Sequence, residues 1–199
     1  EGLLLVNHGH FTWGKNAKES YDKVIDHTNK VYAWIQKKIK KKTYTYSKIN
    51  VLSNEDQIKL LSKIRGDIQK NSILYNFNPT FDIRSNENIN NFLSRNDLLH
   101  LSKRGVSSPD HVIRIKGNPM VLSCNFDFTE IELKLKSFRN EYIEYFNKNK
   151  KRFKNKLTML NPNPNVIWAP GIGLIGVGGD KASASVAADI ASQNINVMM

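Results

Sequence analysis

The residues best placed to do chemistry are the histidines of the segment Asn7-His8-Gly9-His10. His8 follows the apolar run Leu3 to Val6 and precedes a glycine, a pattern typical of a buried strand that runs into a tight turn. A neutral imidazole held in such a turn can donate a lone pair to a metal ion. Alternate residues of a strand point to opposite faces, so joint ligation by His8 and His10 would require an irregular turn. A hydrogen-bonded structural histidine is the commoner alternative, and residue types alone leave both interpretations open.

Other residues with chemical potential are assigned to no site. Asp110 follows Pro109 and is expected to cap a turn rather than to orient the His111 imidazole. Arg114 and Lys116 could meet a phosphate, but isolated basic residues usually face water. His27 and His100 lie in helical patterns and are interpreted as surface or packing residues.

The glycines near the end of the chain have the spacing of a dinucleotide-binding turn. Gly171, Gly173 and Gly176 satisfy G-x-G-x-x-G after a strand-like run. That motif requires a helix to begin among the glycines, where its amides meet the pyrophosphate. Here the intervening residues are apolar and the helix cap is expected only at Asp180, so nucleotide binding by this loop is the weaker interpretation.

Apolar periodicity predicts alternating short strands and amphipathic helices, which favours a layered α/β fold. The expected strands lie at 3–6, 11–13, 72–77, 111–115 and 166–169. The expected helices follow the caps Asn16, Thr129 and Asp180 or lie at 54–70 and within 88–103. In the 54–70 helix we expect an inner face made by Ile58, Leu61, Ile64 and Ile68.

Composition excludes several classes of protein. The 199 residues include 30 Lys and Arg against 18 Asp and Glu, a net charge of +12, and 40% of the residues are apolar. Disorder and a membrane span are not expected. The basic residues are 23 Lys and only 7 Arg beside 24 Asn, which indicates a coding bias rather than a nucleic-acid surface. The single Cys124 rules out an internal disulfide or a cysteine-based zinc site.

Three stretches resemble the class II aldolase/adducin family. Glu1 to Gly14 with Ala17-Lys18-Glu19-Ser20-Tyr21 looks like its final active-site segment. Ser108 to Lys116 and Pro170 to Gly178 are similar to stretches of the bifunctional rhamnulose-phosphate aldolase/short-chain dehydrogenase subfamily, in the same order. The resemblance implies a partial α/β/α aldolase sheet, followed by a mixed α/β connecting region.

The resemblance also implies a chemistry. In such aldolases zinc is held by three histidines, two from a His-x-His element and one from the Asn-His-Gly loop, and only His8 matches the last of these. The His-x-His element and the catalytic glutamate lie earlier in the family's sequence, so the catalytic residues are unknown here. The implied reaction is cleavage of a phosphorylated ketose to dihydroxyacetone phosphate and lactaldehyde, with zinc as Lewis acid. An NAD-dependent dehydrogenase domain would follow Met199.

These matches give an expected division of the chain. Residues 1–42 would end an aldolase domain, 43–160 would form the connecting region, and 161–199 would form a glycine-rich strand-loop-helix unit. Shifted by 164 positions, Leu3 to Gly14 overlays Ile167 to Gly178 with His8 on Ile172, so the last unit is a candidate degenerate repeat of residues 3–30. Because residue 1 is glutamate, we expect a fragment of a longer polypeptide.

Two alternatives to the aldolase interpretation stay open. One is a non-catalytic, adducin-like interaction module, and the other is a nicotinamide-binding dehydrogenase segment. The expected partner is a small sugar phosphate, with no nucleic acid and no membrane, in a cytoplasmic protein. A homo-oligomer is also left open.

Overall fold

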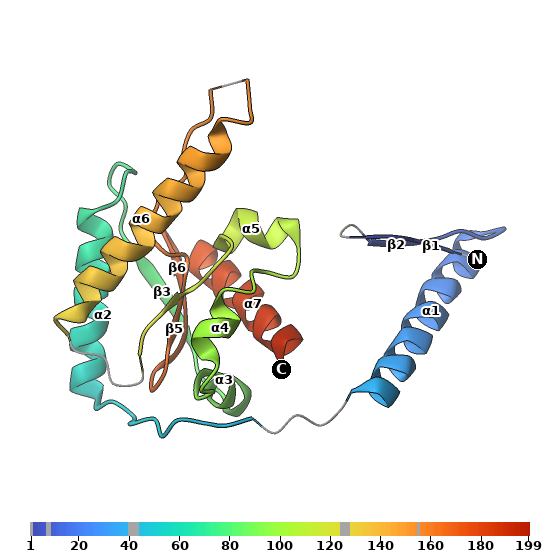
Figure 1. Cartoon of the computed structure of the whole chain (residues 1–199), viewed down its shortest axis with the longest axis horizontal. Coiled ribbons are helices and arrows are strands. Elements are labelled where there is room, and N and C mark those ends of the chain that lie inside the picture. Colours follow the sequence, from blue (N-terminus) through green and yellow to red (C-terminus); the bar gives the residue numbers. More distant parts are fainter. Residues whose placement is uncertain (1, 7–8, 40–43, 124–127, 155) are drawn as a thin grey trace. The chain divides into compact units, whose positions relative to one another are not determined.

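The computed structural model describes residues 2–6, 9–39, 44–123, 128–154 and 156–199. The chain divides into two compact units, residues 1–43 and residues 44–199 (Figure 1). We call them the hairpin unit and the sandwich unit and describe each by itself.

The hairpin unit consists of two strands and one long helix. Strands β1 (Gly2–Leu5) and β2 (Gly9–Thr12) pair in antiparallel fashion, and α1 (Ala17–Lys38) follows. Asn16 caps α1 as expected, since its side chain accepts a hydrogen bond from the Glu19 amide at 2.9 Å. Thr12 and Ser20 exchange hydrogen bonds of 2.7 and 3.0 Å between side-chain hydroxyls and backbone carbonyls, which fastens β2 to the helix.

The first strand forms where it was expected, but it is not buried. All four residues of β1 are exposed, with Leu4 at 73%, and no residue of α1 is buried. The expectation of a buried strand was wrong because a hairpin and a single helix offer only two layers of residues. The apolar side chains therefore form no closed core within this unit.

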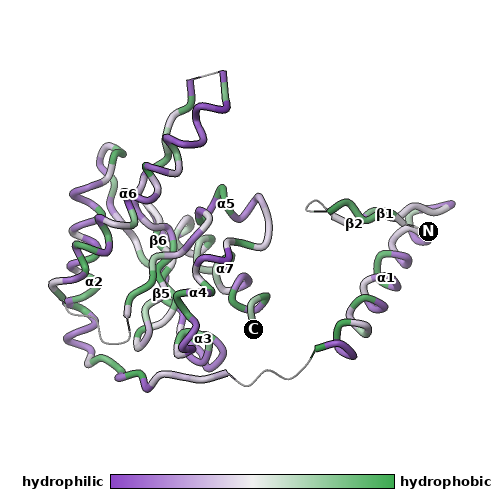
Figure 2. Tube along the Cα trace, in the orientation of Figure 1, coloured by the Kyte–Doolittle hydropathy of each residue, from purple (hydrophilic) through white to green (hydrophobic). Residues whose placement is uncertain are grey.

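The sandwich unit is built on a four-stranded sheet. Its strands are β3 (Thr80–Arg84), β4 (Met120–Val121), β5 (Val166–Ala169) and β6 (Gly173–Gly178), in the order β3-β6-β5-β4. Neighbouring strands are antiparallel except β4 and β5, which run parallel. The expected strand at 166–169 is thus central, and so is β6, where a loop was expected. Figure 2 shows hydrophobic residues in the middle of this unit.

Alternate residues of the central strands serve two separate cores. Ile167 and Ile175 pack with α2 (Asn54–Lys70) and α6 (Glu130–Lys150) on one face. Trp168 and Leu174 pack on the other face with the remaining helices, which are α3 (Glu87–Leu93), α4 (Leu98–Ser102), α5 (Pro109–Ile115) and α7 (Lys181–Met198). The expected layered α/β fold is confirmed, and its α/β/α layers lie in the sandwich unit rather than before residue 43.

Two expected strands were wrong. Residues 72–77 form turns because Asn76 adopts a left-handed φ of 51° and the Ser72 hydroxyl accepts a hydrogen bond from the Leu74 amide, so the strand β3 begins only after Pro79. Residues 111–115 are helical because Ser108 caps α5 and Pro109 occupies its first turn, where a missing N–H costs nothing.

The inner face of α2 is rotated from the expected one. Leu60, Ile64 and Ile68 are completely buried, Leu61 is half-buried, and Ile58 is 65% exposed. The bounds of α2 agree with the prediction. The error arose because the apolar residues of this helix form a broad face. Their spacing alone does not decide which edge of that face is buried.

The hairpins of the two units have the same internal pairing. Gly2 pairs with Thr12 as Val166 pairs with Gly176, and the other three pairs of each hairpin correspond at the same offset of 164 residues. The helices begin at Ala17 and Lys181, again at this offset, and each is capped by the preceding side chain, Asn16 or Asp180.

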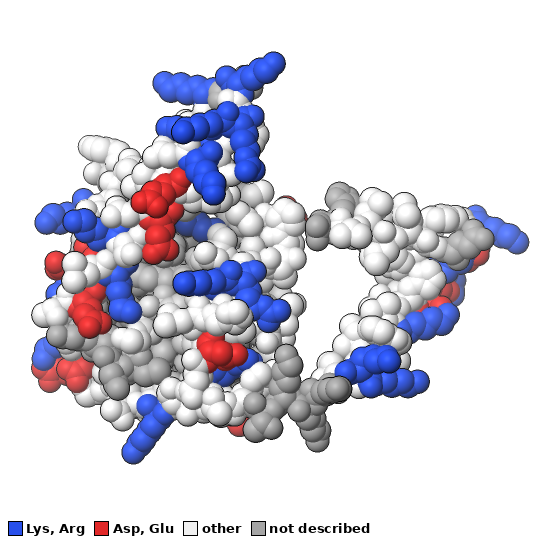
Figure 3. All heavy atoms as spheres, in the orientation of Figure 1, with Lys and Arg blue, Asp and Glu red and all other residues white. Residues whose placement is uncertain are grey.

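Positive charge collects at the far end of α6 (Figure 3). Lys148, Lys150, Lys151, Arg152 and Lys154 are all exposed there. Cations near a helix C-terminus interact favourably with the helix dipole. This interaction accounts for part of the cluster. Within the described residues, no helix has the length and apolar character needed to cross a bilayer.

Two glycine substitutions, one against α7 and one control in α2, test the close packing of α7 on the sheet. A Cβ on Gly176 would lie 2.6 Å from the Ala188 amide nitrogen and overlap the Ala184 carbonyl oxygen. We expect Gly176→Ala to lower the free energy of unfolding by at least about 2 kcal/mol, because backbone atoms of α7 must shift. Gly66 lies in α2 with open space around it, so Gly66→Ala should raise that free energy by about 0.5–1 kcal/mol. Urea denaturation measures both, and equal effects would contradict the packing described.

Candidate functional site

The expected metal ligand, His8, lies outside the described residues, and so does Cys124. The strands on either side of His8 are described. The pairing of Leu5 with Gly9 brings the two ends of the intervening segment together. The strands on either side of the segment are therefore paired, while Asn7 and His8 themselves lie outside the described residues.

The second histidine of this segment is paired with another histidine. The His10 Nε2 and His27 Nδ1 atoms are 3.0 Å apart, and the ring centroids are 5.1 Å apart. Among the described parts of the chain, no group of three or more His, Cys, Asp or Glu side chains is placed to hold a metal ion. The described residues alone therefore do not fit the zinc site that the aldolase resemblance implies.

The glycine-rich segment does not form a dinucleotide-binding turn. Gly173 and Gly176 belong to strand β6, and the following helix begins only at Lys181 after the Asp180 cap. The amides at the start of α7 are engaged by Asp180 and Ser183, which form a capping box. The nicotinamide-binding alternative is therefore wrong for this loop.

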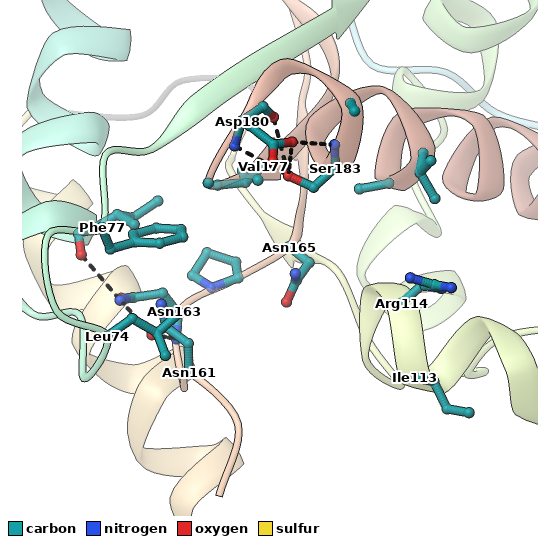
Figure 4. A pocket seen from close by; sticks show the side chains of 17 residues that line it. Leu74, Phe77, Ile113, Arg114, Asn161, Asn163, Asn165, Val177, Asp180 and Ser183 are labelled. Carbon is teal, nitrogen blue, oxygen red and sulfur yellow. Dashed lines mark hydrogen bonds between the residues drawn. The ribbon is translucent and has the colours of Figure 1, made fainter.

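The sandwich unit contains a cavity of about 470 Å³ beside the start of α7 (Figure 4). Its lining has Asp180 and Ser183 at one end, Phe77 at one side and Arg114 of α5 at another. The segment Asn161 to Asn165, which leads into β5, crosses the cavity wall. Amide, hydroxyl, carboxylate and guanidinium groups therefore face a space large enough for a small ligand.

The cavity suits binding better than acid–base catalysis. Asp180 is the only Asp or Glu among the described lining residues, which include no His or Cys. Hydrogen bonds from the Ser183 amide and hydroxyl lower the pKa of Asp180 and hold its carboxylate on the helix. A carboxylate that caps a helix is poorly suited to carry protons. If it moved away to do so, the helix amides would lose their acceptor.

Asn163 fastens the cavity wall to three helices. It is 3% exposed, and its side-chain amide nitrogen lies 3.1 Å from the Ile68 carbonyl oxygen at the end of α2. Its side-chain oxygen accepts from Arg139 of α6 at 3.1 Å. Its backbone carbonyl accepts from the Lys116 ammonium, just after α5, at 2.6 Å.

The Arg139 side chain is held in turn by Asp67 of α2. The guanidinium and carboxylate form an ion pair in which the two side chains are 12% and 13% exposed. Because both charges are nearly buried, removal of either partner would leave the other without compensation. The pair therefore fixes Arg139 in the position from which it reaches Asn163.

Lys116 is a buried amine that has no carboxylate partner among the described residues. Its ammonium donates to Asn163 and to the Asn165 side-chain oxygen, and it lies 5.1 Å from the centre of the Tyr142 ring. Burial lowers the pKa of Lys116 to about 7. Lys116 also has a left-handed φ of 64°, so its backbone and its side chain are both held in uncommon states.

The other unassigned residues of this region have separate positions. His111 contacts the Ser107 hydroxyl at 2.9 Å and the Asn194 side-chain oxygen at 3.3 Å, which ties α5 to α7. Arg114 lines the cavity.

Sequence reasoning missed both Lys116 and Asn163 as members of one network. The available signal was the run Asn161-Pro162-Asn163-Pro164-Asn165. Proline fixes φ and holds the preceding residue extended, so amide side chains repeat along a stiff segment.

The Asn163 network yields a stability prediction. We expect Asn163→Ala to lower the free energy of unfolding by about 3 kcal/mol, because several buried partners lose a hydrogen bond together. Asn147, which is exposed on α6, is the control, and Asn147→Ala should change that free energy by less than about 0.5 kcal/mol. Equal losses in a urea titration would refute the role assigned to Asn163.

Lys116 yields a pH prediction. Its folded-state pKa of about 7 lies below the ordinary lysine value of 10.5, so the unfolded chain binds more protons between these values. The free energy of unfolding should therefore rise with pH above 7, by at most about 1.4 kcal/mol per pH unit from this group. In Lys116→Met this contribution should vanish. Denaturation at pH 7.5 and 9 compares the two proteins, and parallel pH profiles would contradict a lowered pKa.

Comparison with known proteins bears on the family. The model of the family "Aldolase class II, second domain" matches residues 55–199. The chain is 25% identical over 212 residues to the uncharacterized oxidoreductase YuxG of Bacillus subtilis (strain 168), with all of this chain covered. The chain spans 29% of the length of that relative. No solved structure matches the chain.

These findings agree with the resemblance found in the sequence and with the α/β/α layering of the sandwich unit. The family match covers nearly all of the sandwich unit, including the cavity and the Asn163 network. Because the matched region is well over half of the chain, the chain belongs to the class II aldolase family.

Proposed function

We propose that the whole protein is a zinc-dependent class II aldolase that cleaves a phosphorylated ketose of the rhamnulose 1-phosphate type. The products would be dihydroxyacetone phosphate and lactaldehyde. The observation that carries this proposal is the β1–β2 hairpin, which flanks the Asn7-His8-Gly9 segment and is tied to the capped helix α1. Membership of the class II aldolase family supports it.

In this proposal His8 is one of several zinc ligands, and the others come from outside residues 1–199. Two observations motivate that division. The ring of His10 is engaged with His27, and the described residues offer no cluster of three ligands. The chain on its own should therefore bind zinc weakly, because one imidazole cannot hold the ion firmly.

We further propose that the whole protein includes an NAD-dependent dehydrogenase domain, which would act on the lactaldehyde. The motivation is the relative YuxG, which is named as an oxidoreductase and is much longer than this chain. The glycine-rich strand β6 is not that nucleotide site, because its helix begins too late to present amides to a pyrophosphate.

The matched pair His8→Ala and His10→Asn in the whole protein tests the aldolase proposal. We expect His8→Ala to lose most of its zinc and at least about 100-fold in cleavage of rhamnulose 1-phosphate, because one metal ligand is gone. His10→Asn should keep its zinc, since His10 contacts His27 instead. Elemental analysis gives zinc per chain, and a coupled assay for dihydroxyacetone phosphate gives the rate.

The possible results separate the alternatives. Zinc and activity that survive in His8→Ala would overturn the role of His8. A whole protein that folds but neither binds zinc nor cleaves the ketose would favour the non-catalytic, adducin-like module.

A further inference from the structure

A second cavity lies at the turn between β5 and β6. It measures about 290 Å³, and residues of four separate segments line it. These are the extended segment 47–51, Ser85 just after β3, residues 90–94 at the end of α3, and the turn residues Gly171 and Ile172. The volume is at the lower end of the range of small-molecule pockets.

The polar groups of this cavity are all neutral. They belong to Ser47, Ser85, Asn90, Asn91 and Ser94, and none of the described lining residues is ionisable. Ser85 donates to the Asn90 side-chain oxygen at 3.2 Å, and no described residue accepts from the Asn90 side-chain amide. The Asn91 side chain makes no hydrogen bond to any described residue and is exposed. Hydroxyl and amide groups can both donate and accept, as the hydroxyls of a sugar do.

The cavity is held open by ordered backbone. The Ser47 amide donates to the Ser94 carbonyl at 2.7 Å, and the Ile172 amide donates to the Ala169 carbonyl at 3.0 Å. Gly171 has a φ of +87°, and a Cβ on it would lie 2.7 Å from the Asn50 carbonyl oxygen. The turn and the 47–51 segment therefore meet at van der Waals distance, so the walls exist before a ligand arrives.

The position of this cavity corresponds to the His8 segment of the hairpin unit. The β1–β2 and β5–β6 hairpins share their pairing and their capped helices at an offset of 164 residues. At that offset Ile172 stands in the place of His8. Ile172 is only 7% exposed and belongs to the core of the sandwich unit. In the sequence, the second hairpin therefore has an isoleucine at the position equivalent to His8, which itself lies outside the described residues.

We infer that residues 166–198 repeat the hairpin-and-helix arrangement of the first unit, and that the cavity at their turn binds a neutral polyhydroxylated ligand of monosaccharide size. This site needs no metal ligand, because hydroxyl and amide groups alone can hold such a molecule. It is independent of the zinc chemistry proposed for the whole protein.

The lining distinguishes this ligand from a sugar phosphate. A phosphate would have to give up its hydration without any Lys or Arg among the described lining residues to replace it. The Ser47, Ser85 and Ser94 hydroxyls already donate to Asn96, Asn90 and the Asn91 carbonyl. A neutral sugar would therefore donate to these hydroxyl oxygens and accept from the Asn side-chain amides.

The experiment uses the 199-residue chain and saturation-transfer NMR, with D-glucose, D-ribose and D-fructose as neutral probes and glucose 6-phosphate as the charged one. We expect at least one neutral sugar to bind with a Kd on the order of 1 mM, a value common for small polar ligands. Asn91→Leu should weaken that binding at least about tenfold, and Asn88→Leu, on the same helix but away from the cavity, should leave it unchanged.

Every other outcome contradicts the inference. If no neutral sugar binds at a concentration about 50-fold above the expected Kd, the inference is wrong. Binding that Asn91→Leu leaves intact would place the sugar elsewhere. Tighter binding of glucose 6-phosphate than of glucose would contradict the neutral character of the ligand. None of these results depends on zinc or aldolase turnover, so the proposed function could stand if this inference fails.

Discussion

The sandwich unit depends on one buried amide, the side chain of Asn163. Its side-chain amide donates to the Ile68 carbonyl at the end of α2, and its side-chain oxygen accepts from Arg139 of α6. Its backbone carbonyl accepts from Lys116, just after α5. Apolar burial brings the layers together, but it has no direction. The hydrogen bonds of Asn163 set where the segment entering β5 must lie, and with it one wall of the larger cavity.

Much of the layered fold could be predicted from the sequence because caps and apolar periodicity, which are local features, define the helices and strands. The caps at Asn16 and Asp180, the bounds of α2 and the strand Val166–Ala169 all follow from neighbouring residues. The errors arose where contacts with residues distant in the sequence determine which side chains are buried. Ile58 faces solvent although its helical spacing fits the stripe, and the burial of Lys116 depends on residues almost fifty positions away.

The candidate site was harder to predict than the fold, because its members are common residues with uncommon surroundings. Lysine and asparagine abound in this chain, so neither type stands out in the sequence. Lys116 differs from the other described lysines in its burial, and Asn163 differs from the other described asparagines in the number of its hydrogen-bond partners. The glycines show the opposite case, since their spacing satisfies a nucleotide motif while their backbone forms strand β6. The late cap at Asp180 had already made nucleotide binding the weaker interpretation, and the structure confirms it.

In this account apolar burial and the hydrogen bonds of Asn163 hold the sandwich unit together, and the zinc chemistry that we propose would belong to the His8 segment. Amide hydrogen exchange on the 199-residue chain, with zinc and with a chelator, tests this division directly. We expect equal protection of β5, β6 and α7 under both conditions. Loss of protection in these elements on chelation would contradict the account, because it would show that a metal ion stabilises the unit.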